Sequence, residues 1–563
     1  MKLNGVISPG AEQKNMRTTI TLDKFSHQPC VPAQDITQSD SLGLIAYAER
    51  IAEDYLSISS AKKRKSKGQF FTPQQVSLFM ASLLDINKQK FSVLDPGAGT
   101  GMLSAAVCES ILSSRKQIVF SLDAYETDSE VIPLLNNVLR KCQSVLRENG
   151  HNLKYRIITE DFILDNSHRI KTQLGFEEKE TLLSYDYIIS NPPYFKLNKN
   201  SPQTLLLGEI VSGQPNIYTF FMTLSLEMLK PEGKMVFITP RSFCSGLYFK
   251  AFRKWLLQHG RITNIHMFES RSDVFGNDAV LQENIITGIV PKKNDSESNK
   301  VTITTSQNSS FNNVKRSDID YQDIFHQLNG QLMIKIPITK TDVKVQYIVN
   351  SWKYTLKDFG IKVSTGPVVS FRAEKYLSPE YIDENQTAPL LWMHNIQNMD
   401  VVWPVEKKKK EPAIILEENT APLLVPVKNY VLVKRFSSKE QKRRLYAGVL
   451  LKSKFKFDKV GIENHLNYIY KYHGVLSIDE AYGIAGLLNS SLMDIFFRML
   501  NGSTQVNAVD IDNLPLPSLE KIKEIGESII IKKLSIGLEL DKIIIDVLGI
   551  DTEILRELNG SNY

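Results

Sequence analysis

Residues 91–101, FSVLDPGAGTG, decide the fold class of this chain. The first four residues are mostly apolar and are typical of a buried strand, which ends at Asp95. The turn after it holds three glycines: Gly97, Gly99 and Gly101. Glycines let the backbone approach a ligand closely, and apolar residues at 103–107 indicate a helix whose first amides are free. The stretch therefore predicts an α/β domain that holds a nucleotide-type ligand at this turn.

A glycine-rich turn of this kind could also hold a dinucleotide. The acid at the strand end and the GxGxG spacing, in place of GxGxxG, argue against that alternative. A second expected strand, residues 120–125, ends at Glu126, which is placed to accept hydrogen bonds from ribose hydroxyls; Asp128 could substitute for it. A third strand, residues 155–158, precedes Asp161 and Phe162.

A fourth strand, residues 187–189, stops at Asn191-Pro192-Pro193-Tyr194, because neither proline can donate to a β-ladder. Ligands of open α/β sheets bind at such strand ends. The exocyclic amine of adenine is a poor nucleophile, since its lone pair is delocalised into the ring. The Asn191 side-chain oxygen and the Pro192 carbonyl could accept its two hydrogens while Tyr194 stacks on the base. Alone, the four residues are equally a proline turn, and their context decides.

The composition is that of a globular protein. The chain has 563 residues, 42% of them hydrophobic, and a net charge of +6, which predicts about two to four domains and permits a polyanionic partner. Its four cysteines show no CxxC and no zinc-type spacing with histidine, so neither a disulfide framework nor a metal site is expected. Without a membrane-length apolar run or a signal-peptide core, we expect a cytoplasmic protein.

The N-terminal region predicts an extension. Residues 1–38 are polar and aperiodic, residues 42–56 indicate an amphipathic helix, and a basic cluster at residues 62–67 is either a solvated face or a phosphate contact. The next expected helix has Thr72 as its N-cap and Pro73 at its first helical position.

In this order, Thr72-Pro73, the turn after Asp95, Glu126, Asp161-Phe162 and the Asn191 loop resemble the motif series of the amino-methylating DNA methyltransferases of the gamma class. The resemblance continues through residues 216–218, 229–238 and 273–276. It implies S-adenosylmethionine as methyl donor and a class I methyltransferase fold, Rossmann-like with a mixed sheet. It also implies an α+β target-recognition domain after the catalytic one.

The resemblance also implies roles for individual residues. Phe275 would lie with Tyr194 against the target base, and Asn191, Pro192, Pro193 and Tyr194 would form the catalytic loop. The residues implied in cofactor binding are Thr72, Asp95, Pro96, Gly97, Gly99, Gly101, Glu126, Asp161 and Phe162.

The second half of the chain is basic. Residues 363–369 and 431–439 resemble the BsuBI and PstI modification enzymes and their Eco57I-type relatives, and residues 502–505 resemble the end of a recognition domain. Period-two alternation at 454–457 and 468–472 predicts half-buried strands. Positive charge gathers at residues 407–410 and 434–444. The residues expected to contact DNA are Lys434, Arg435, Lys442, Arg443 and Arg444.

These patterns predict an extension (1–66), a catalytic domain (67–295), a recognition domain (296–520) and a helical tail (521–563). We expect a DNA adenine-N6 methyltransferase that flips its target base out of duplex DNA and is paired with a separately encoded restriction endonuclease. A cytosine-N4 enzyme is the nearest alternative. A protein-glutamine or RNA methyltransferase is a further one, although such enzymes are typically shorter, and a non-enzymatic DNA-binding subunit would not need these site residues together. The oligomeric state stays open.

Overall fold

The computed structural model describes residues 43–60, 68, 71–169, 183–207, 215–269, 283–292, 299–328, 331–437 and 440–560. It divides the chain into residues 1–43 and a compact unit, residues 44–563, to which all that follows belongs. The polar N-terminal segment, the basic cluster at residues 62–67 and Phe275 lie outside the described residues. No helix in the described ranges is long and apolar enough to cross a membrane.

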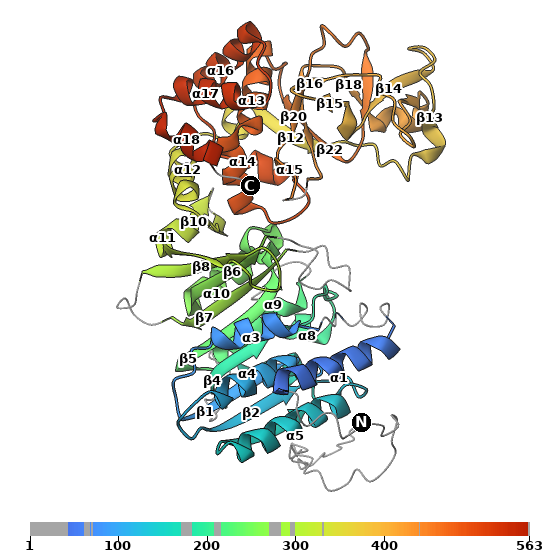
Figure 1. Ribbon diagram of the computed structural model, residues 1–563. Helices are drawn as coiled ribbons and strands as arrows, with labels where there is room; N and C mark the ends of the chain where they lie inside the picture. Colours follow the sequence, from blue (N-terminus) through green and yellow to red (C-terminus); the bar gives the residue numbers. More distant parts are fainter. Residues whose placement is uncertain are drawn as a thin grey trace, which may run out of the picture. The chain divides into compact units, whose positions relative to one another are not determined.

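The catalytic half is built on one mixed sheet in the order β3-β2-β1-β4-β5-β7-β6-β8-β9 (Figure 1). The first five strands in this order, β3, β2, β1, β4 and β5, run parallel to one another. Strand β7 lies between β5 and β6 and is antiparallel to both. This arrangement confirms the predicted α/β class and the class I methyltransferase fold. The strands are β1 Lys90–Pro96, β2 Val119–Tyr125, β3 Asn152–Ile158, β4 Tyr185–Ser190, β5 Leu229–Pro240, β6 Gly260–Phe268, β7 Asn284–Pro291, β8 Lys300–Ser306 and β9 Lys315–Asp320.

Helices cover both faces of this sheet. Neighbouring strand residues point to opposite faces, so Val93 joins one core and Leu94 the other. Helices α1, α3, α4 and α5 pack in the core of Val93, and α6, α9 and α10 pack in the core of Leu94. The helices are α1 Leu44–Ile58, α3 Gln74–Ser82, α4 Met102–Leu112, α5 Ile132–Glu148, α6 Phe162–Asn166, α8 Pro202–Leu207, α9 Ile217–Glu227 and α10 Lys250–His259.

The domain boundaries differ from those predicted. Helix α1, placed in the N-terminal extension, shares a core with α4, and strands β8 and β9 extend the catalytic sheet beyond residue 295. The helices after residue 520 share one core with residues 345–516, so they are part of the second domain.

The second half contains two sheets with a common core, in the orders β12-β22-β19-β20-β16-β15 and β13-β17-β14-β21-β18. Leu432 and Leu450 of the first sheet meet Leu391 and Ile462 of the second, and Val431 on the opposite face packs against the C-terminal helices. This α+β arrangement agrees with the fold class expected for the region.

Short strands and a set of C-terminal helices make up the second half. The strands are β10 Phe325–Leu328, β11 Gln331–Ile334, β12 Ile361–Thr365, β13 Leu377–Ser378, β14 Thr387–Leu391, β15 Ile396–Gln397, β16 Asp400–Val401, β17 Ala413–Ile415, β18 Leu424–Pro426, β19 Tyr430–Lys434, β20 Ala447–Leu450, β21 Lys459–Ile462 and β22 Leu466–Lys471. The helices are α11 Tyr321–Ile324, α12 Lys340–Asn350, α13 Ile478–Asn489, α14 Ser491–Leu500, α15 Ala508–Asp512, α16 Leu519–Lys532, α17 Leu538–Leu548 and α18 Glu553–Gly560.

One of the two strands predicted in this region from period-two alternation is wrong. Strand β22 confirms the segment from residue 468, but residues 454–457 form no strand. Phe455 and Phe457 instead pack with their ring centroids 6.1 and 5.2 Å from that of Trp403. The alternation there comes from two rings that pack on one indole.

Candidate active site

A cavity of about 490 Å³ lies at the carboxyl ends of β1, β2 and β4. It brings together eight of the predicted site residues: Thr72, Gly97, Gly99, Glu126, Asp161, Phe162, Asn191 and Pro193. It is also lined by Phe71, Phe195, Ile217 and Phe221, which the sequence patterns did not single out. Chain segments far apart in sequence therefore supply one mixed polar and aromatic site.

The glycine turn is tied to the end of β2. The amides of Gly97 and Ala98 both donate to the Tyr125 carbonyl, at 3.0 and 2.8 Å. Gly101 has φ +94°, and a Cβ there would lie 2.9 Å from Leu135 of α5. Its glycine is required by helix packing rather than by the cavity, which it does not line.

Glu126 is held in one orientation at the end of β2. Its Oε2 accepts from the Gly99 amide at 2.9 Å and its Oε1 from the Asp128 amide at 2.8 Å. Burial raises the pKa of the carboxyl, and the two amides oppose that rise. Glu126 and Asp128 both line the cavity, so Glu126 stays the predicted acceptor of ligand hydroxyls and Asp128 the alternative.

Asp95 is fully buried, and only one of its two carboxylate oxygens accepts a hydrogen bond from the described residues. Its Oδ2 accepts from the Ser104 hydroxyl at 2.6 Å, whereas its Oδ1 has no hydrogen-bond partner within the described residues. Burial raises the pKa of Asp95 to about 7; the Ser104 bond works against this rise and Glu126 adds to it. An unsatisfied buried carboxylate oxygen is costly, and a ligand ammonium nearby would favour its charged form. Asp95 does not itself line the cavity, but its unsatisfied oxygen fits the ammonium at the amino-acid end of S-adenosylmethionine.

Asp161 caps helix α6. Its Oδ1 accepts from the amides of Ile163 and Leu164 at 2.9 and 3.0 Å, and its Oδ2 from Gln203 Nε2 at 3.0 Å. Phe162 beside it is buried, with its ring 5.0 Å from that of Phe221. An aspartate before an apolar run is a known N-cap signal, so the cap was predictable, whereas Gln203 had no such signal.

Asn191 is oriented by two neighbours at the end of β4. Its Nδ2 donates to Thr72 Oγ1 at 3.0 Å, and its Oδ1 accepts from the Tyr194 hydroxyl at 2.5 Å. The prediction that Thr72 caps the next helix is therefore wrong. Helix α3 begins at Gln74, and Pro73 occupies the N-cap position without a side-chain cap. The Thr72 hydroxyl accepts from Asn191 instead. An amide oxygen has two lone pairs, so it can accept from Tyr194 and from a substrate amine together.

Tyr194 lies against the protein interior in this structure. Its hydroxyl is also 2.8 Å from the Ile238 carbonyl, and its ring meets that of Tyr218 edge-on at 6.3 Å. Burial raises the pKa of Tyr194, so the hydroxyl remains a donor at neutral pH. Stacking of Tyr194 on a target base stays a prediction.

Arg443 and Arg444, expected to contact phosphate, are buried. Arg444 is 1% exposed and donates to the carbonyls of Asn501 and Ser503 and to the Ser437 hydroxyl, while Arg443 donates to the Asn489 carbonyl. Burial argues against the predicted phosphate contacts, because these guanidinium groups donate to carbonyls and hydroxyls of neighbouring loops instead. Lys442 is exposed, and Lys434 and Arg435 are half-buried.

Three lysines, Lys407, Lys410 and Lys434, gather with His394 around the loop at residues 404–412. Lys410 lies 4.0 Å above the Trp392 ring, and His394 Nε2 is 3.2 Å from the Val405 carbonyl. Burial lowers the pKa of His394, and the three lysines lower it further. Within the described part of the chain, none of these four forms an ion pair with a carboxylate.

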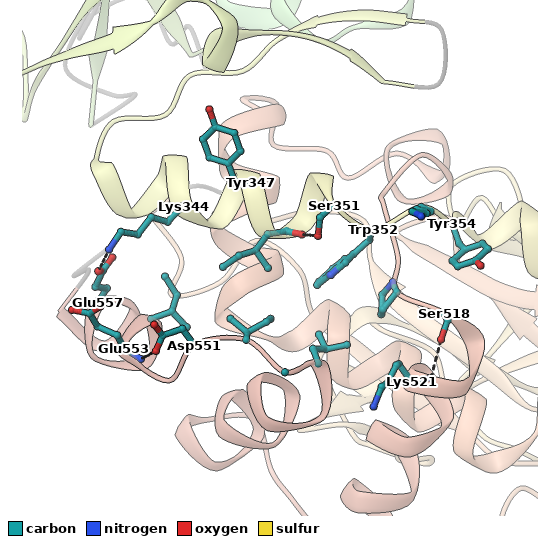
Figure 2. Close-up of a pocket in the computed structure, with 17 residues that line it drawn as sticks. Lys344, Tyr347, Ser351, Trp352, Tyr354, Ser518, Lys521, Asp551, Glu553 and Glu557 are labelled. Atoms are coloured by element: carbon teal, nitrogen blue, oxygen red, sulfur yellow. Dashed lines mark hydrogen bonds and ion pairs between the residues drawn. The ribbon is translucent and has the colours of Figure 1, made fainter.

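A larger cavity, about 730 Å³, lies between α12 and the C-terminal helices (Figure 2). Trp352 and Tyr354 line one part of it, and the Lys344–Glu557 ion pair another. It contains none of the predicted site residues, so the smaller cavity is the candidate active site despite its size.

Comparisons with known proteins identify relatives of this chain. Residues 105–275 match the Eco57I restriction-modification methylase family. The chain is 35% identical over 467 residues to the type II methyltransferase M.PstI of Providencia stuartii, covering 83% of this chain and 90% of the relative. It is 35% identical over 489 residues to M.BsuBI of Bacillus subtilis, covering 86% and 94%. A solved DrdV–DNA complex matches with TM-score 0.47 and 13% identity, over 88% of this chain and 60% of that one.

Proposed function

Because the chain belongs to the type II methyltransferase family of M.PstI and M.BsuBI, we propose that it methylates the N6 amine of an adenine in duplex DNA. The observation that carries this proposal is the Asn191 amide. Thr72 and Tyr194 orient it in a cavity that also contains Glu126 and Asp161. As the modification half of a restriction-modification system, the enzyme would act in the cytoplasm beside a separately encoded endonuclease.

We assign one set of residues to the methyl donor and another to the target base. S-adenosylmethionine supplies an electrophilic methyl group when bound. Asp95 would hold its ammonium, Glu126 its ribose, and Asp161 with Phe162 its adenine. Asn191 Oδ1 and the Pro192 carbonyl would accept the two amine hydrogens of a flipped base, which keeps electron density on the attacking nitrogen. Tyr194 and Phe275 are proposed to stack on that base.

Sequencing that detects methylated bases, on DNA from cells expressing the protein, tests the proposal. We expect methylated adenine at every copy of one short sequence and none in cells carrying an empty vector. Methylation absent from the DNA despite folded protein would contradict the proposal. A cytosine-N4 enzyme would use the same two acceptors, and the base that is modified separates the two.

Glu126→Ala should weaken S-adenosylmethionine binding by about 1 to 3 kcal/mol, because a fixed, charged acceptor is lost. Calorimetric titration measures the change. Glu130→Ala, at an exposed position outside the cavity, is the matched control and should bind as the wild type does. Equal affinities for both variants would remove Glu126 from the cofactor site.

We propose that Lys407, Lys410 and Lys434 contact DNA phosphates, since their unpaired charges lie together. Replacing all three by glutamine should weaken binding to every duplex and lower the salt slope by about 0.9 for each phosphate that is no longer neutralised. Fluorescence anisotropy over a salt series measures both. A variant with arginine at all three positions should bind DNA as the wild type does. Replacing Lys116, Lys532 and Lys542, which are exposed elsewhere on the protein, by glutamine is the matched control. An unchanged slope would show that the lysines face only solvent.

A further inference from the structure

The turn between β21 and β22, residues 463–465, lies at one end of the sheet that contains β12, β22 and β19, and hydrogen bonds hold it in place. The Asn464 amide donates to the Val368 carbonyl at 2.8 Å. Arg435 accounts for two more bonds: its amide donates to the His465 carbonyl at 2.8 Å and its Nη1 to the Asn464 carbonyl at 3.0 Å. Arg435, expected from sequence to contact DNA, therefore positions this turn.

His465 is a partly exposed residue of the turn, and contacts with Glu463 and Phe436 set the orientation of its side chain. Its Nδ1 lies 2.6 and 2.8 Å from the two carboxylate oxygens of Glu463, and its backbone amide donates to the same group at 2.8 Å. The Glu463 side chain is 0% exposed, whereas that of His465 is 38% exposed. The Phe436 ring packs against the imidazole at 4.7 Å. The Glu463 carboxylate and the Phe436 ring together restrain the orientation of the His465 imidazole.

This pairing leaves one polar atom of the ring for a partner. A carboxylate only accepts, so Nδ1 carries a hydrogen in either protonation state. Nε2 makes no hydrogen bond to any residue that the structure describes. The carboxylate below cancels any positive charge on the ring, so the pair offers phosphate no net attraction. Its free nitrogen is suited instead to one directional bond with the edge of a base.

The turn lies on the side of the recognition domain that contacts the catalytic domain. Phe436 pairs with Gln505, and Gly502 in the same loop packs on Arg241 and Glu283. Arg241 directly follows β5, whose Ile238 carbonyl lies 2.8 Å from the Tyr194 hydroxyl of the catalytic loop. A chain of contacts thus connects His465 to the sheet edge where the target base would enter.

We propose that His465 determines sequence specificity by binding a base edge of the recognition site through Nε2, an inference that rests on the proposed function. A neutral ring accepts from the exocyclic amine of adenine or cytosine, and a protonated ring donates to guanine O6 or N7 in the major groove. Glu463, Phe436 and Arg435 act as positioning residues for this contact.

His465→Asn tests the proposal, because the shorter amide can still donate to Glu463 but has no atom at the position of Nε2. Methylation rates on the cognate duplex and on all single-base-pair variants give the discrimination at each position. We expect kcat/KM on the cognate duplex to fall roughly 10- to 100-fold, and discrimination at one base pair to fall by a similar factor. The salt slope of binding should not change. His473→Asn, at an exposed position of the same domain, should behave as wild type.

His465→Gln, which keeps a polar atom near Nε2 and loses the donor to Glu463, should retain more of the discrimination and guards against a misfolded first variant. Unchanged discrimination in folded His465→Asn would overturn the proposal. So would a uniform loss with a slope lower by about 0.9, which would assign His465 to a phosphate. A wild-type protein that methylates no DNA would instead overturn the proposed function itself.

Discussion

Replacing Asn191 with alanine is expected to slow methyl transfer at least ~100-fold while S-adenosylmethionine still binds. The amide is held by Thr72 and Tyr194 before any substrate arrives, so its oxygen is already placed when positive charge develops on the attacking amine. Such preorganised acceptors contribute mainly to the transition state. The loss should therefore fall on the chemical step and leave cofactor affinity unchanged.

Single-turnover methylation with enzyme in excess isolates that step. Thr72→Val, which removes only the hydroxyl that accepts from the amide, should reproduce part of the loss. Asn149→Ala, at an exposed asparagine at the end of α5, is the matched control and should retain the full rate. A near-normal rate for Asn191→Ala would show that Asn191 is only a turn residue.

Replacing Arg444 with alanine should lower the free energy of unfolding by on the order of 3 kcal/mol. Its guanidinium donates to two carbonyls of the loop at residues 501–503 and lies 5.6 Å from the Phe497 ring. Truncation leaves these buried acceptors unsatisfied and opens a cavity in the core.

The midpoint of urea unfolding measures this change. Lys442→Ala, two residues away and exposed, should stay within about 0.5 kcal/mol of the wild type. If Arg444→Ala kept both its midpoint and its DNA affinity, the arginine would be dispensable. If it kept the midpoint but lost DNA affinity, the phosphate contact that its burial argues against would have to be reconsidered.

The catalytic fold was predictable because its signals are local. The buried runs that became β1, β2 and β4 each end in a polar residue or a glycine turn, and such strand ends meet at one edge of a parallel sheet. That geometry alone predicts that Asp95, Glu126 and Asn191 lie close together.

The errors concern properties that a local pattern does not contain. Thr72 matched a helix cap, but its hydroxyl is used by Asn191, 119 positions further along the chain. Arg443 and Arg444 added to a count of positive charge, which carries no information on burial. The polar stretch around residue 300 matches a domain boundary in composition, but half-exposed strands are also polar. Strand β8, where buried and partly exposed residues alternate, is an example.

The measurement that tests this account most directly is the identity of the methylated nucleoside. Purified protein would be incubated with duplex DNA and S-adenosylmethionine carrying an isotopically labelled methyl group. The DNA would then be digested and its nucleosides analysed by mass spectrometry. The account predicts labelled N6-methyladenine, and none when Asn191→Ala is used for the same short time. Labelled N4-methylcytosine, or no labelled nucleoside from a folded protein that binds the cofactor, would contradict it.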